Sequence, residues 1–378
     1  MDNQLLNTLY TTYKATTLFG RYIQLKDITP LINNLPEFCK VEVIGQSVLG
    51  ESISSITIGN GPIKVLMWSQ MHGNESTTTK AVFDMLNTFS DASMQSLLDA
   101  CTLKIIPMLN PDGSAAYTRL NANAVDLNRD AQDLSQPESV VLNTCFKRFK
   151  PDYCFNLHGQ RTVFSVGDTN KPATLSFLSP SQDKNRSVTT TRQKAMHVIS
   201  AINMGLQDDL PNQIGRYDDG FNINCVGDAF QSLNAPTILF EAGHYKDDYN
   251  REVVRGFVYK ALLLALNYIV SEDKQRFDVT HYNAIPENGK RFYDVMIRNA
   301  QFKDQILDIG INYQERLLNN TVKFMPKVVA ITDLSKFYGH KEIDANHNKV
   351  LNHDNKLISI DYENDFVVIN NVKLSLNL

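Results

Sequence analysis

The sequence lacks several features that mark specialised classes of protein. Its 37 basic and 41 acidic residues give a formal net charge of -4, so there is no basic excess to bind nucleic acid or an anionic membrane surface. No apolar run approaches the roughly 18 residues that a membrane-spanning helix needs. The first residues, MDNQLLNTLYTTYK, contain no basic stretch followed by an apolar one, so we expect no signal peptide. We therefore expect neither nucleic acid nor a membrane among the partners.

Cysteines are few and scattered. None belongs to a CxxC pair, and an odd count of five without an export signal argues against a disulfide framework. Several lie among apolar residues, where a thiol packs as a small hydrophobic group. We expect reduced cysteines and a cytoplasmic location. The five residues are Cys39, Cys101, Cys145, Cys154 and Cys225.

Strand-like and helix-like segments alternate through most of the chain. The runs IKVLMWS, TLKIIPML, DYCFNLH and PTILFE are typical of buried strands. Between and after them come patterns with helical spacing, at residues 76–89, 137–149, 186–210 and 251–270. This alternation predicts an α/β domain over residues 1–273, with a mixed, mostly parallel sheet and helices on both faces.

The character of the sequence changes after about residue 274. Short β-forming runs, FYDVMIRNA, KVVAITD, NKLISID and DFVVINNVKLSL, are separated by Asn, Asp and Gly residues typical of turns. We predict a small β-rich C-terminal domain over residues 274–378 and assign it no role.

Polar side chains stand where the predicted strands of the α/β domain end. His72 and Glu75 follow the first of the buried runs, while His158 and Glu241 close two others. The segment NPDG, residues 110–113, follows a further run. In open α/β sheets ligands bind beyond the carboxyl ends of the strands, so these residues are expected to share one edge.

The types of side chain at this edge suit a catalytic zinc ion. Such an ion takes three protein ligands and keeps an open position for water, which it acidifies. His72, Glu75 and His158 supply two imidazoles and a carboxylate, so we predict one Zn²⁺ per chain. Glu241 remains as a carboxylate that can accept the proton of the water and pass it to the leaving group.

The motifs in this order resemble those of the carboxypeptidase A-like zinc metallopeptidases. They are HGNE at residues 72–75, NPDG, TRLNANAVDLNR at 118–129, NLHG at 156–159 and LFEAG at 239–243. The resemblance extends over roughly residues 40 to 270. It implies the zinc carboxypeptidase fold and supports the same metal ligands and general base.

The resemblance also implies roles for four further residues. Arg119 would polarise the scissile carbonyl and stabilise the oxyanion. Asn128 and Arg129 would hold the terminal carboxylate of the substrate, which an arginine can grip bidentately. Tyr217, in the loop-like segment GRYDDGFN, would close over the substrate. NPDG would shape the chain that carries Arg119.

The predicted function is hydrolysis of the C-terminal amide bond of a peptide. The substrate would be a peptide or an acyl-amino acid with a free carboxylate, and a homo-oligomer stays open. One alternative is a zinc-dependent N-acyl amino acid deacylase of the aspartoacylase or desuccinylase kind. A non-catalytic binding module is a further alternative, although the presence of all three ligands and Glu241 argues against it. By analogy, Asp228 would favour a basic C-terminal residue if it points into the specificity pocket, and otherwise an apolar one would be favoured.

Overall fold

The computed structural model describes residues 1–271 and 277–378, and the chain divides into two compact units. The first unit comprises residues 1–160 and 173–288, and the second comprises residues 161–172 and 289–378. Each unit has its own sheets, and the first unit has two apolar cores while the second has one.

This division differs from the predicted one. The predicted boundary between residues 273 and 274 lies outside the described residues. Helix α10 (Val279–Asn283) follows that point and still belongs to the first unit, so the β-rich unit begins later than expected. The β-rich unit also includes residues 161–172 from the middle of the chain. No change of composition marks that excursion in the sequence.

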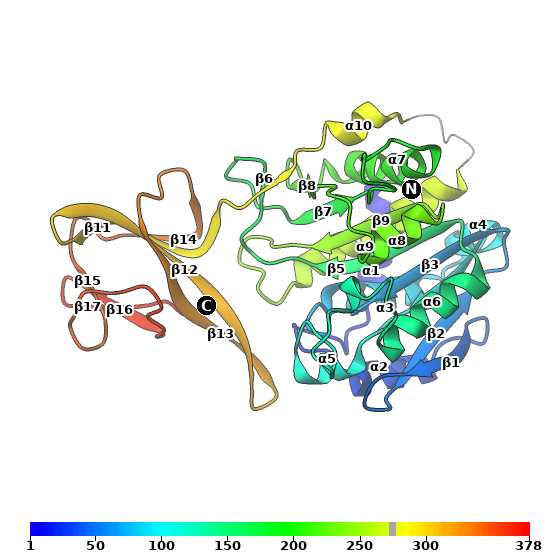
Figure 1. Cartoon of the computed structure of the whole chain (residues 1–378), viewed down its shortest axis with the longest axis horizontal. Helices are drawn as coiled ribbons and strands as arrows, with labels where there is room; N and C mark the ends of the chain where they lie inside the picture. Colours follow the sequence, from blue (N-terminus) through cyan, green and yellow to red (C-terminus); the bar gives the residue numbers. More distant parts are fainter. Residues whose placement is uncertain (272–276) are drawn as a thin grey trace. The chain divides into compact units, whose positions relative to one another are not determined.

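An eight-stranded mixed sheet is the framework of the first unit (Figure 1). Its strand order is β1-β2-β4-β3-β5-β9-β7-β8, and the central neighbours β4, β3, β5 and β9 run parallel. This arrangement confirms the predicted mixed, mostly parallel sheet. The strands are β1 (Lys40–Gln46), β2 (Ser52–Ile58), β3 (Ile63–Ser69), β4 (Cys101–Ile106), β5 (Tyr153–Gly159), β7 (Leu175–Leu178), β8 (Ile214–Arg216) and β9 (Thr237–Ala242).

Helices cover both faces of this sheet, as predicted (Figure 1). Successive strand residues point to opposite faces, so Met67 joins one apolar core and Trp68 the other. The larger core contains side chains of α1, α3, α7 and α9, and the smaller contains those of α6 and α8. The helices are α1 (Asn3–Tyr13), α2 (Leu25–Asn33), α3 (Thr77–Thr88), α4 (Gln95–Ala100), α5 (Pro111–Ala116), α6 (Pro137–Phe149), α7 (Thr190–Leu206), α8 (Val226–Ser232) and α9 (Glu252–Val270), with short 3₁₀ turns η1 (Ala92–Met94) and η2 (Leu127–Arg129).

Helix α9 is the most apolar helix of the first unit. By length and composition alone it could span a membrane, and 72% of its apolar window is buried inside the structure. It packs against α3 and α7 and supplies a long series of residues to the larger core. A helix that is apolar on all sides is expected at such a position, so core packing accounts for its composition.

The second unit contains a four-stranded sheet, a three-stranded sheet and a short two-stranded sheet. A four-stranded sheet has the order β13-β12-β11-β14, with β14 parallel to β11, and a three-stranded sheet has the order β15-β16-β17. Both sheets contribute to one apolar core, which contains Val295, Ile311, Val328 and Val367. Its strands are β6 (Ser165–Val166), β11 (Phe292–Phe302), β12 (Gln305–Leu318), β13 (Thr321–Thr332), β14 (Tyr338–Asp344), β15 (Val350–Leu351), β16 (Phe366–Ile369) and β17 (Val372–Ser375), and β10 (Asn288–Gly289) spans the boundary between the units.

Paired asparagines make two of the tight turns in this unit. Asn319 and Asn320 join β12 to β13, and Asn370 and Asn371 join β16 to β17, all with positive φ. Two positive-φ residues in a two-residue loop match the right-handed twist of a hairpin, and asparagine tolerates them well. The run NKLISID at residues 355–361 was expected to be a strand, and that prediction is wrong. It forms turns and isolated bridges instead, through Leu357 and its neighbours.

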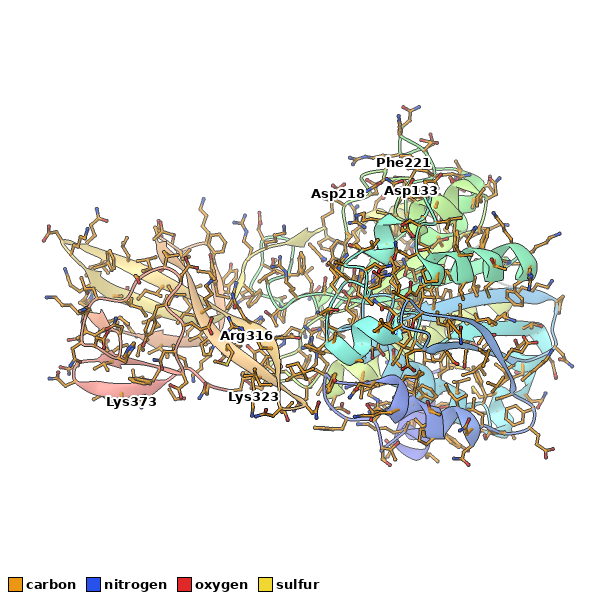
Figure 2. All side chains as sticks on the ribbon, turned by 60° about the horizontal axis from the view of Figure 1, so that its bottom comes forward. Asp133, Asp218, Phe221, Arg316, Lys323 and Lys373 are labelled. Carbon is orange, nitrogen blue, oxygen red and sulfur yellow. The ribbon has the colours of Figure 1, made fainter. Side chains whose placement is uncertain are left out.

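The long β12–β13 hairpin carries charged side chains. Arg316 on β12 and Lys323 on β13 lie directly opposite each other (Figure 2). The two terminal nitrogens of Arg316 donate hydrogen bonds to the two carboxylate oxygens of Glu363, at 2.5 and 2.7 Å. Basic residues on a hairpin at the edge of a sheet discourage pairing with another chain, and the bidentate carboxylate offsets their mutual repulsion.

Candidate metal centre

The topology of the first unit brings the polar strand ends together. β5 and β9 are neighbouring parallel strands, and His158 on β5 lies directly opposite Glu241 on β9. On its other side β5 pairs with β3, which ends at Ser69, three residues before His72. Because these strands are parallel, their carboxyl ends meet at one edge. His72, His158 and Glu241 thus share an edge although up to 169 positions separate them in the sequence.

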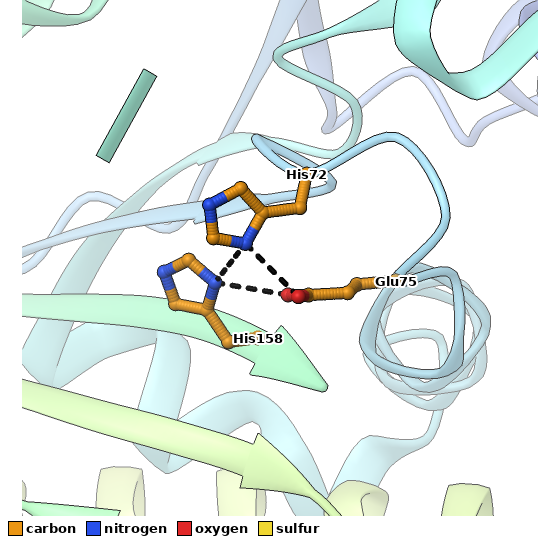
Figure 3. A group of neighbouring side chains, drawn as sticks. All are labelled: His72, Glu75 and His158. Atoms are coloured by element: carbon orange, nitrogen blue, oxygen red, sulfur yellow. Dashed lines mark hydrogen bonds and ion pairs between the residues drawn. The ribbon is translucent and has the colours of Figure 1, made fainter. Parts of the chain in front are cut away.

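Three donor side chains gather there: His72, Glu75 and His158 (Figure 3). Nδ1 of His72 lies 2.9 Å from Oε1 of Glu75 and 3.1 Å from Nδ1 of His158. Nδ1 of His158 lies 2.9 Å from Oε2 of Glu75. Both imidazole side chains are only 2% exposed. The three predicted ligands therefore present their donor atoms toward one point.

Hydrogen bonds orient these donors. Nε2 of His72 donates to Oδ1 of Asp126 at 3.0 Å, which leaves a lone pair on Nδ1. Nη1 of Arg119 donates to that Nδ1 at 3.1 Å, in agreement with this tautomer. The N–H of Gly159 donates to Oε2 of Glu75 at 2.9 Å. A carboxylate on the second nitrogen is the usual partner of a metal-binding histidine.

The donor set fits a zinc ion. Zinc binds imidazole nitrogen and carboxylate oxygen at about 2.0–2.2 Å, so tetrahedral donors lie roughly 3.3 Å apart. The separations of 2.9–3.1 Å between the donor atoms are close to that value. Two imidazoles and one carboxylate also leave one position of a tetrahedral ion open for water or substrate.

The electrostatic environment separates the two glutamates. Burial alone would raise the pKa of Glu75, but the imidazoles of His72 and His158 hold that pKa well below its usual range. Burial raises the pKa of Glu241 well above its ordinary value, and the negative charge of Glu75 adds to the rise, while Arg119 opposes it. Oε2 of Glu241 is buried and makes no hydrogen bond within the described structure. One carboxylate is thus tied to the imidazoles, and the other has an oxygen available.

The NPDG segment supports the loop that carries His72. The N–H of Gly113 donates to Oδ1 of Asn110, which caps α5, and the N–H of Thr118 donates to the carbonyl of Gly113 at 2.8 Å. A Cβ on Gly73 would lie 1.9 Å from the main-chain carbon of Gly113, so only glycine allows this approach. The segment therefore shapes the chain on both sides, toward the ligands and toward Arg119.

Arg119 lies beside the donors, as the resemblance implied. Its Nε and Nη2 each lie 3.0 Å from Oδ2 of Asp126, and Nη1 lies 3.4 Å from Oε1 of Glu75. The side chain is 45% exposed, so one face of the guanidinium is open to solvent. It is held at one end by Asp126 and presents its other end next to the donor atoms.

Asn128 and Arg129 lie on η2, immediately after Asp126. The N–H of Asn128 donates to Oδ1 of Asp126 at 2.9 Å, so this turn is linked to the donor cluster. Oδ1 of Asn128 accepts from the N–H of Val226 at 3.0 Å, which ties the turn to the start of α8. Arg129 is exposed, and its Nη1 donates to the carbonyl of Asn128.

Asp228 lies in the first turn of α8. It is 7% exposed, and Oδ1 accepts from the N–H of Asn222 at 3.3 Å. Burial raises the pKa of Asp228 to about 6, although Arg129 and Arg192 act in the opposite direction. No contact of Asp228 with the three donors is present among the described residues.

Tyr217 follows β8 and lies near the end of β5. Its hydroxyl donates to Oε1 of Gln160 at 2.7 Å. Gln160 is buried, and its Nε2 donates to the carbonyl of Ala173 at 2.7 Å. Tyr217 is therefore linked by a hydrogen bond to Gln160, which lies two residues after His158 in the chain.

Sequence reasoning missed two residues that shape this site, Asp126 and Gln160. Both stand inside or beside the motifs already quoted, Asp126 in VDLNR and Gln160 directly after NLHG. The need of a ligating histidine for a carboxylate on its second nitrogen is a signal that could have drawn attention to Asp126. For Gln160 no such rule exists, because its importance comes from Tyr217 across the fold.

Parts of the sequence match a known protein family and a curated relative. A family model described as zinc carboxypeptidase matches residues 26–224, more than half of the chain. A curated relative, gamma-D-glutamyl-L-diamino acid endopeptidase 1 of Lysinibacillus sphaericus, is 35% identical over 101 residues, which cover 24% of this chain and 25% of the relative. The match thus spans about a quarter of that relative's length.

Solved structures share the fold over most of this chain. A metallo-carboxypeptidase from Pseudomonas aeruginosa in complex with (2-guanidinoethylmercapto)succinic acid has a TM-score of 0.52 and 19% identity, and the match covers 67% of this chain and 70% of that one. The carboxypeptidase A of Helicoverpa armigera has a TM-score of 0.53 and 16% identity, with 72% and 81% coverage. At these identities the likeness shows the fold alone.

Proposed function

The chain belongs to the zinc carboxypeptidase family, and we propose that it hydrolyses the C-terminal amide bond of a peptide with one zinc ion per chain. The observation that carries this proposal is the convergence of His72, Glu75 and His158 at one strand edge, with Glu241 directly opposite His158. Zinc bound there would supply Lewis-acid chemistry, acidifying a water molecule and polarising the scissile carbonyl.

Glu241 is proposed as the base and then the acid. Its Oε2 makes no hydrogen bond in the described structure, and the positive charge of a bound zinc ion would oppose the rise of its pKa, so the ionised carboxyl could accept a proton from the attacking water. The same carboxyl then returns the proton to the leaving nitrogen. Its place on β9, fixed opposite His158, keeps the proton acceptor near the reacting carbonyl.

Arg119, Asn128 and Arg129 are proposed to bind the charged parts of the substrate. Nη1 of Arg119 lies beside the donor atoms, where the oxyanion of a tetrahedral intermediate would form. Arg129 is exposed at the end of η2 and can offer its planar donors to a terminal carboxylate. Oδ1 of Asn128 accepts from Val226, so its Nδ2 is the group proposed to join Arg129 at that carboxylate, and Tyr217 would close over the bound residue.

More than one class of substrate fits this proposal. The relative named gamma-D-glutamyl-L-diamino acid endopeptidase makes such peptides candidates beside ordinary peptides. N-acyl amino acids remain the alternative substrate. A cytoplasmic location stays a prediction, supported by the five unpaired cysteines.

The proposal is tested by metal content and a substrate panel. The panel contains N-blocked dipeptides with basic, apolar and acidic C-terminal residues, their C-terminal amides, γ-D-glutamyl-diamino acid peptides and N-acyl amino acids. About one zinc per chain, with release of the C-terminal residue from free acids and none from amides, is the expected result. Turnover of N-acyl amino acids alone would move the protein to the deacylases. If the chain binds no zinc and hydrolyses none of these substrates, the non-catalytic binding module is the alternative that remains.

A further inference from the structure

One buried arginine cross-links the ends of β5 and β9. Arg251 is 2% exposed, and its Nη1 donates to the carbonyl of Ala242 at 2.6 Å. Its Nη2 donates to the carbonyl of Gln160 at 2.9 Å. These carbonyls come one residue after Glu241 and two residues after His158. Each terminal nitrogen of one guanidinium therefore holds one of the strands that carry the site.

The two strands separate just beyond this point. Their last mutual bond runs from the N–H of Gln160 to the carbonyl of Ala242, at 2.9 Å. After it, the N–H of Gly243 donates to Thr174, and the chain after Gln160 enters the second unit. Beyond His158 and Glu241, few main-chain hydrogen bonds therefore fix the distance between β5 and β9.

The backbone of Arg251 is in a conformation that arginine does not favour. Its φ is 58°, in the left-handed region, at the residue that precedes α9. A side chain with a Cβ is sterically disfavoured there. Helix α9 does not need arginine to begin, because the carboxylate of Asp248 accepts the N–H groups of Glu252, Val253 and Val254. The side chain, directed at the strand ends, is the feature that glycine would lack.

We propose that Arg251 is a positioning residue that sets the spacing between His158 and Glu241. This rests on the proposed function, in which His158 is a zinc ligand and Glu241 accepts the proton of the attacking water. A guanidinium is a rigid planar fork, so two carbonyls bound to its two ends are held at a defined separation. Lysine offers a single point charge and cannot reproduce that geometry. A displacement of about 1 Å between reacting groups can reduce the rate roughly 100-fold.

The test compares Arg251→Gly and Arg251→Lys with the wild type. Glycine adopts positive φ freely, so Arg251→Gly removes the side chain and leaves the backbone before α9 unstrained. Arg255→Lys is the matched control, because Arg255 is a fully buried arginine in the first turn of α9 and binds Asp84 instead of the strand ends. Each protein is assayed for kcat, KM, thermal unfolding and the visible absorption of bound Co²⁺, which reports the geometry of the ligands.

We expect kcat to fall about 100-fold in both Arg251 variants, with KM within about threefold of the wild type. The Co²⁺ bands should shift in these variants and stay unchanged in Arg255→Lys, which should lose stability and keep its kcat. The proposal is overturned if folded, metal-loaded Arg251→Gly keeps the wild-type kcat and Co²⁺ spectrum, or if Arg255→Lys changes both equally. If the wild type hydrolyses no substrate, the proposed function fails, and the Co²⁺ spectra alone decide the role of Arg251.

Discussion

The first unit contains two groups of charged side chains, one buried and one partly open to solvent, and they differ in how many of their polar atoms have a partner within the chain. One group, the helix cluster, consists of Asp84, Arg255, Glu252 and Lys80. The guanidinium of Arg255 binds Asp84 through two nitrogens at 2.7 Å, and Nζ of Lys80 lies 2.5 Å from Oε1 of Glu252. Arg255 also donates to the carbonyls of two residues of the N-terminal segment. Every charged group here has a partner within the chain.

The other group, the site cluster, consists of His72, Glu75, His158, Arg119 and Asp126. Its two histidines are buried like the side chains of the helix cluster, but some of its polar atoms have no hydrogen-bond partner in the described structure. Nε2 of His158 has no hydrogen-bond partner in the described structure, and neither has Oε2 of Glu241 on the neighbouring strand. The donor atoms of three residues also face one another rather than separate partners.

The difference separates charge used for stability from charge kept for a ligand. A buried ion pair that is fully hydrogen-bonded holds segments together, and in the helix cluster these are the N-terminal segment, α3 and α9. Donor atoms that converge on one point repel one another, so a cation bound between them would lower the cost of burying them. Variants in the two clusters should therefore change different measured quantities.

The largest expected effect is on catalysis. Glu241→Gln removes the proton acceptor while keeping the shape of the side chain, so kcat should fall about 1,000-fold. Thermal unfolding should stay the same or shift upward, because a neutral amide avoids the cost of burying a negative charge close to Glu75. Peptide hydrolysis and calorimetry measure the two quantities. A variant that keeps more than a tenth of the wild-type kcat would exclude Glu241 as the base.

The opposite pattern is expected for the helix cluster. Asp84→Asn leaves the charge of Arg255 buried without its carboxylate, so the free energy of unfolding should fall by about 3–5 kcal/mol. The kcat of the folded protein should remain within twofold of the wild type. Urea unfolding followed by circular dichroism gives the first quantity. If kcat fell with the stability, the two clusters would not be separate.

A smaller effect, on metal affinity, is expected from Asp126→Asn. An amide can still accept from Nε2 of His72, but it loses the charge that holds both that imidazole and Arg119. Zinc affinity should fall about 10–100-fold, as measured by competition with a chelator. Asp130→Asn serves as the control. That buried carboxylate accepts the N–H groups of Ser135 and Gln136 and, among the described residues, makes no hydrogen bond to a predicted zinc ligand. Equal losses in both variants would contradict the role given to Asp126.

The smallest effect concerns pH and Asp228. Burial raises its pKa from 3.8 to about 6, so the folded chain binds this proton more tightly than the unfolded chain. The resulting stability is fully present below pH 3.8 and is lost as the pH rises through about 6. Asp228→Asn should therefore raise the free energy of unfolding at pH 8 by about 1–2 kcal/mol. Near pH 3.8 it should have little effect, and a gain independent of pH would rule out ionisation as the cause.

The elements that sequence reasoning predicted well are those with strong local patterns. Helix α6 begins and ends where expected, because proline at its start and the spacing of its apolar residues are local signals. The donors His72, Glu75 and His158 could be proposed because their chemical types match one metal. The segment 161–172 could not be assigned to the second unit, since its ties, such as the ion pair of Asp168 with Arg291, join distant parts of the chain.

The sequence by itself determined the kinds of side chain at the strand ends, their order and the family to which the chain belongs. Tertiary structure alone decided which partners orient them: Asp126 on His72, Gln160 on Tyr217 and Arg251 on the ends of β5 and β9. The physical reason is that residue type and periodicity are local properties of the chain. A hydrogen bond between residues more than fifty positions apart depends instead on the register of the sheet that brings them together.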